Sequence, residues 1–143
     1  MAKRLSGNLV GSTGGGSSSR TEVSGTTASI EAAASTDLTI TNTGKTGHLL
    51  HIETSAAAWV TVYASQATRT ADASREETTD PAAGSGVLAE VITTGAQTVL
   101  FTPMANFFNG ESTPSSELYL KVVNKSEAST AITVTLTVVA TEA

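Results

Sequence analysis

The sequence has no cysteine, only 4% aromatic residues and only 15% charged residues. Without cysteine the chain has no disulfide framework, no thiolate metal site and no cysteine nucleophile, and redox chemistry does not reveal its compartment. No apolar run reaches the 18 residues of a membrane span, and the basic start Met1-Ala2-Lys3-Arg4 is not followed by the apolar stretch of a secretory signal. We therefore expect a chain that is made in the cytoplasm and contacts no membrane.

Residues with a hydroxyl group or a β-branched side chain dominate the composition. The 143 residues include 25 Thr, 17 Ser and 12 Val, whereas strong helix formers such as Leu, Lys and Glu are sparse. Thr and Val are stiff at χ1 and fit a pleated, half-buried surface better than a helix. A chain of this length suffices for one hydrophobic core. The composition therefore predicts a single all-β domain.

The charge is divided unevenly along the chain. Residues 1–20 contain Lys3, Arg4 and Arg20 and no acid, which gives +3, whereas residues 21–143 contain 5 bases and 13 acids, which gives −8. An acidic body argues against nucleic-acid binding, because a protein must neutralise phosphates to hold them. The basic segment is suited to an acidic neighbour.

Residues 1–20 are rich in Gly and Ser, a composition that buries too little apolar surface to offset the entropy of ordering. Such a segment becomes ordered most easily along another protein. We predict an extended N-terminal arm over 1–20, with contacts between subunits, and a β-sandwich domain over 21–143. A solvated tail that improves solubility is the alternative interpretation.

Short alternating segments separated by turn residues begin at Thr21. The last is the clearest, since Ile132, Val134, Leu136 and Val138 alternate with threonines. In residues 59–63 the buried face is ambiguous. The number of segments predicts an antiparallel β-sandwich or jelly roll of about eight strands. The expected strands are residues 21–30, 37–41, 48–54, 59–64, 87–93, 97–102, 117–124 and 131–139.

Two longer stretches interrupt this pattern. Residues 65–86 are rich in charge, and a loop of this length in a compact domain is usually functional or disordered. Residues 103–116 contain Met104, Phe107 and Phe108, which are expected either to cap the core or to contact a partner. We therefore expect both stretches to be irregular.

No residue pattern indicates catalysis or a cofactor. The only histidines, His48 and His51, are three residues apart, so a regular strand would point them to opposite faces and prevent them from sharing a metal. Neither lies beside a glycine-flanked serine elbow. Glu76, Glu77 and Asp80 lack the spacing of a calcium loop. We expect no enzyme activity, no cofactor and no metal.

The segments between residues 59 and 126 resemble a known class of proteins, and this resemblance suggests a function. Residues 59–63 (WVTVY), 69–75 (RTADASR), 79–94 (TDPAAGSGVLAEVITT) and 122–126 (VVNKS) resemble small β-sandwich structural proteins of tailed-bacteriophage virions, over roughly residues 37–141. The resemblance implies a capsid decoration or cement protein that binds the coat lattice and stabilises it through its N-terminal arm and loops. A neck, tail or fibre accessory protein, or a module that binds carbohydrate or a cell surface, is the alternative.

This resemblance implies that the chain is located in the virion after synthesis in the host cytoplasm. Its partners would be the major capsid protein or other virion proteins, without nucleic acid or membrane. Unpaired sheet edges also favour a homo-oligomer. The expected partner-binding residues are Lys3, Arg4, Leu5, Leu9, Val10, Arg20, Arg69, Arg75, Phe107 and Phe108.

Overall fold

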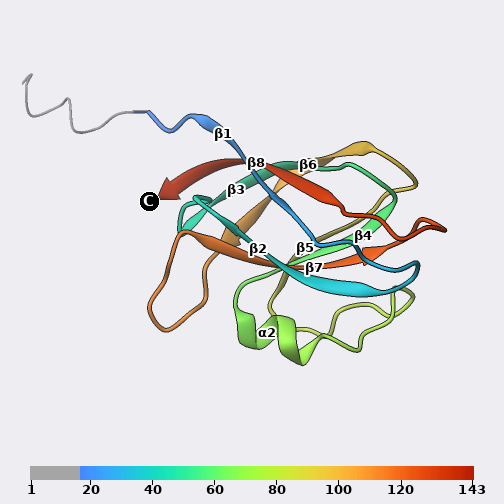
Figure 1. Cartoon of the computed structure of the whole chain (residues 1–143). Coiled ribbons are helices and arrows are strands. Elements are labelled where there is room, and N and C mark those ends of the chain that lie inside the picture. Colours follow the sequence, from blue (N-terminus) through green and yellow to red (C-terminus); the bar gives the residue numbers. More distant parts are fainter. Residues whose placement is uncertain (1–16) are drawn as a thin grey trace, which may run out of the picture.

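A computed structural model describes residues 17–143 and shows eight strands and one short helix (Figure 1). The all-β prediction is thereby confirmed. No helix of the described residues is long and apolar enough to cross a membrane. The elements are β1 (Arg20–Thr26), β2 (Ser35–Thr41), β3 (Thr46–Thr54), β4 (Ala58–Tyr63), α2 (Gln66–Ala71), β5 (Val87–Ile92), β6 (Gln97–Phe108), β7 (Glu117–Asn124) and β8 (Thr133–Glu142).

The strands form two four-stranded antiparallel sheets with the orders β1-β8-β3-β6 and β2-β7-β4-β5. The pairing follows a simple rule: β1 pairs with β8, β2 with β7, β3 with β6 and β4 with β5. This is one long hairpin folded across two sheets, which is the topology of an eight-stranded jelly roll. The strand order thus decides between the two architectures that the sequence left open.

Apolar side chains from both sheets meet between them. In β8, Val134, Leu136 and Val138 are buried in the core, as the alternation predicted. In β4, Val60 and Val62 belong to this core, which resolves the ambiguity of residues 59–63. The opposite face of β4 is also covered, because all six residues of the strand are buried. Something must therefore cover that sheet from outside.

The observed strand limits correct two expectations. β1 begins at Arg20 and ends at Thr26, whereas a strand was expected over residues 21–30. β6 continues through Pro103 to Phe108, although 103–116 was expected to be irregular. Proline has no N–H to donate to a neighbouring strand. Because β6 is an edge strand of its sheet, the missing hydrogen bond lowers stability little.

Candidate interaction surfaces

The outer face of sheet β2-β7-β4-β5 is covered by the segment that follows β4. Ser65 caps α2, since its hydroxyl accepts the Thr68 N–H while the Thr68 hydroxyl accepts the Ser65 N–H. Gly86 has φ +81° and passes so close to the helix that a Cβ there would lie 2.4 Å from Thr68 Cγ2. Residues 65–86, expected to form a long loop, are therefore a packed cover that includes a helix.

Arg75, a residue of this cover, is at the centre of a charged layer between the cover and the sheet. Its Nε donates to both carboxylate oxygens of Asp72, at 3.0 and 2.9 Å, and its Nη2 lies 2.5 Å from Glu90 Oε2. Asp72 also accepts the Tyr63 hydroxyl at 2.7 Å, and Glu90 accepts the Thr61 hydroxyl at 3.0 Å. Only 7% of the Arg75 side chain is exposed. These paired charges attach the cover to β4 and β5.

Lys121 on β7 supplies a second cation to the layer. Its Nζ donates to the backbone carbonyls of Asp72 and Arg75 at 3.2 and 3.4 Å and lies 4.6 Å from the centroid of the Trp59 ring. The Arg75 guanidinium lies 5.2 Å from the same ring. Burial lowers the pKa of Lys121 below its ordinary value. Trp59 is thus covered by two cations and offers no open aromatic face.

Arg69 on α2 joins the helix to the opposite edge of this sheet. Its Nε lies 3.2 Å from Asp37 Oδ2, its Nη1 donates to the Leu38 carbonyl at 3.2 Å, and its guanidinium lies 5.6 Å from the Tyr119 ring. Both Arg69 and Arg75 were expected to contact a partner. The structure corrects this expectation, because both side chains are buried against groups of their own chain.

The buried hydroxyl of Tyr63 gives this layer a pH dependence. Burial and the Asp72 carboxylate raise the pKa of Tyr63 far above its ordinary value. Above about pH 10 the unfolded chain loses this proton while the folded chain keeps it. The contribution to stability is therefore complete below pH 10 and is lost as the pH rises further.

We expect the free energy of unfolding to fall more steeply between pH 10 and 11 in the wild type than in Tyr63→Phe. Urea unfolding at pH 8, 9, 10 and 11 measures this difference. Lys121 is present in both proteins, so its own titration cancels to first order in the comparison. Parallel curves for the two proteins would contradict the assignment.

The outer face of sheet β1-β8-β3-β6 is different, because most of its outward side chains are exposed or half-buried. The registers place Glu22, Thr137, His51 and Leu100 in one row across the four strands. Glu53 lies beside this row on β3. We call this surface the open face.

Both histidines lie on the open face, so the expectation that they point to opposite faces is wrong. His48 is opposite Val139 and His51 is opposite Thr137, and these two residues of β8 share a face. Leu50 is the extra residue of an irregularity in the register, which shifts the alternation by one. Within residues 17–143 no three His, Asp or Glu side chains are close enough to hold a metal.

A groove crosses the open face beside an irregularity of β6. Leu100 is opposite His51 and Ala105 is opposite Leu49, so the residues between Leu100 and Ala105 have no regular partners on β3. Leu100 and Met104 are 64% and 51% exposed. The groove has a volume of about 520 Å³ and is lined by Arg20 from β1, Leu50 from β3, and Leu100, Pro103 and Met104 from β6.

The remaining residues that were expected to bind a partner have different outcomes. Phe107 is 1% exposed and belongs to the core, so it is not a partner contact, whereas Phe108 is 51% exposed on the open face. Adjacent residues of a strand point to opposite faces, which explains the difference. Arg20 lies at the groove. The expected contacts Lys3, Arg4, Leu5, Leu9 and Val10 lie outside the described residues.

Sequence reasoning missed the groove residues Leu50, Leu100 and Pro103 and the buried partners Asp72 and Glu90. A usable signal for the groove was Leu100, an apolar residue between Thr98 and Thr102 on the polar side of its strand. For the charged layer, the signal was the alternation of Trp59, Thr61 and Tyr63 opposite two valines, which is typical of a strand that is covered on both faces.

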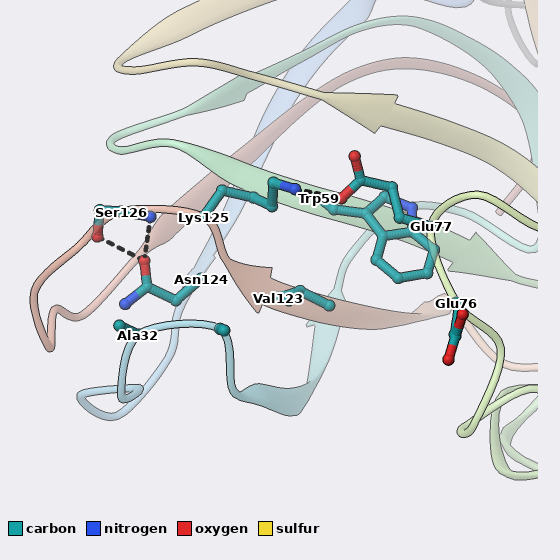
Figure 2. A pocket seen from close by; sticks show the side chains of 9 residues that line it. Ala32, Trp59, Glu76, Glu77, Val123, Asn124, Lys125 and Ser126 are labelled. Carbon is teal, nitrogen blue, oxygen red and sulfur yellow. Dashed lines mark hydrogen bonds and ion pairs between the residues drawn. The ribbon is translucent and has the colours of Figure 1, made fainter.

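A second pocket, of about 380 Å³, lies at the edge of the charged layer (Figure 2). The Lys125–Glu77 ion pair lies beside the indole of Trp59, and Val123 contributes apolar lining. Asn124 accepts from Ser126 and donates to two backbone carbonyls. Since Trp59 is 4% exposed, the pocket has no aromatic platform on which a sugar ring stacks.

Fold and surfaces together define a jelly-roll domain with one face covered by its own chain and one face open. Comparison of the chain with protein-family models, with curated proteins and with solved structures found no match.

Proposed function

We propose that this chain is a structural protein of a bacteriophage virion, a decoration or cement protein that binds the coat lattice through its open face. The observation that carries the proposal is the contrast between the two sheets. One sheet is covered by a charged layer in which Arg75 pairs with Asp72 and Glu90, and it exposes Ile92 on its edge strand β5. The other sheet exposes three large apolar side chains, Leu100, Met104 and Phe108, on its edge strand β6. Exposed apolar side chains on an edge strand are typical of docking surfaces.

The architecture and the resemblance of the segments between residues 59 and 126 support the same role. Jelly rolls are frequent in viral structural proteins, although a fold alone does not determine function. A cement protein gains from many equivalent copies that act together through multivalency. We propose binding without catalysis, with the major capsid protein or another virion protein as partner. A neck, tail or fibre position in the same particle uses the same surface.

Quantitative mass spectrometry of the purified native particle tests the proposal by the copy number of this chain relative to the major coat protein. We expect hundreds of copies per particle, which corresponds to lattice decoration. About a dozen copies would move the protein to the neck or tail. Absence from the particle would overturn the proposal.

A matched pair of variants tests the surface. We expect Phe108→Ser to reduce incorporation into the particle at least about tenfold, because a buried apolar contact of this size is lost. Ile92→Ser is the control, since Ile92 is 47% exposed on β5 of the other sheet. Equal incorporation of the two variants would exclude the open face as the docking surface.

A further inference from the structure

The groove on the open face lies beside the point where the N-terminal arm joins the domain. Arg20 lines the groove and is also the first residue of β1. Residues 17–19, which lead into β1, are exposed. The arm is therefore joined to the domain beside the groove.

The arm and the groove are complementary in apolar character. Leu5, Leu9 and Val10 are the aliphatic residues larger than alanine in the arm, and the groove presents Leu50 and Leu100 among its apolar lining. At most about 33–36 Å of extended chain separates Val10 from Arg20, because ten residues reach no further.

Their charges are complementary as well. Within residues 17–143, Arg69, Arg75 and Lys125 form ion pairs, whereas Glu22 and Glu53 on the open face form none. The arm contains Lys3 and Arg4 and no acid. Its cations therefore match Glu22 and Glu53, while the groove itself also contains the cation of Arg20.

We propose that residues 3–10 of a second copy of this chain occupy the groove. Leu9 and Val10 pack on Leu50 and Leu100, and the two cations of the arm lie near Glu22 and Glu53. Exchange of arms in this way links copies into a closed dimer or ring. The inference concerns the isolated protein and does not depend on a virion location.

Cysteine pairs test the contact directly, because the chain has no native cysteine. Full-length Val10→Cys is mixed with a mass-tagged Leu100→Cys chain under mild oxidation, and the interchain disulfide is followed by non-reducing mass spectrometry. Val10→Cys with Ile92→Cys is the matched control. We expect the groove pair to form at least about tenfold faster than the control.

Equal rates for the two pairs would overturn the proposal. So would a Val10→Cys/Leu100→Cys double variant that closes only intrachain disulfides, since the arm would then occupy its own groove. Sedimentation of the cysteine-free protein is the second readout: we expect Leu9→Ser/Val10→Ser and Leu100→Ser each to weaken self-association at least about tenfold. A wild-type chain that stays monomeric at all concentrations also overturns it.

Discussion

Replacement of Arg75 by methionine is expected to lower the free energy of unfolding by about 3–5 kcal/mol. Methionine retains much of the side-chain volume but removes the cation that pairs with Asp72 and Glu90. Those carboxylates, 10% and 25% exposed, would remain largely shielded from water without their main partner. Urea denaturation at pH 7 measures the change.

Two comparisons make this result specific. Arg20→Met removes the same charge from an exposed site, where we expect a change within about 0.5 kcal/mol. The combination Arg75→Met/Asp72→Asn/Glu90→Gln removes the unpaired charges as well and should recover part of the loss. If Arg75→Met were as stable as Arg20→Met, the charged layer would not hold the cover on the sheet.

Phe107→Ala is expected to cost about 3–5 kcal/mol, because it creates a cavity in the core between the sheets. The adjacent Phe108→Ala removes the same group from an exposed position and is expected to change stability by no more than about 0.5 kcal/mol. Thermal unfolding of both variants under identical conditions provides the comparison.

The two phenylalanines should therefore affect different assays. Phe107→Ala lowers stability, and Phe108 substitutions act on docking to the particle and leave the fold intact. A similar loss of stability in both variants would mean that β6 does not alternate as described. An unchanged Phe107→Ala would exclude this side chain from the core.

The strands were predictable where burial follows a local alternation. Val134, Leu136 and Val138 alternate with threonines, and that period alone predicts a strand with one buried face. The order of the strands was not predictable in this way, since the pairing of Arg20 with Val139 is set by contacts distant in sequence. Sandwich and jelly roll therefore remained equivalent until the pairing was seen.

The surfaces were less predictable, for three physical reasons. Arg69 and Arg75 appear in the sequence as surface charges, and only the fold shows that a short helix carries them onto a sheet. A proline such as Pro103 usually marks the end of a strand, but an edge strand tolerates it. An irregular register at Leu50 moves His51 to the face of His48, and no local signal marks this shift.

The pairing of the first strand with the last also governs when this protein acquires its structure. Among the strands of residues 17–143, β1 pairs only with β8, so the sheet β1-β8-β3-β6 stays incomplete until β8 has been synthesised. Distant pairings of this kind slow folding and leave strand edges accessible in the meantime. Removal of β8 therefore leaves β1 without a template and exposes the core.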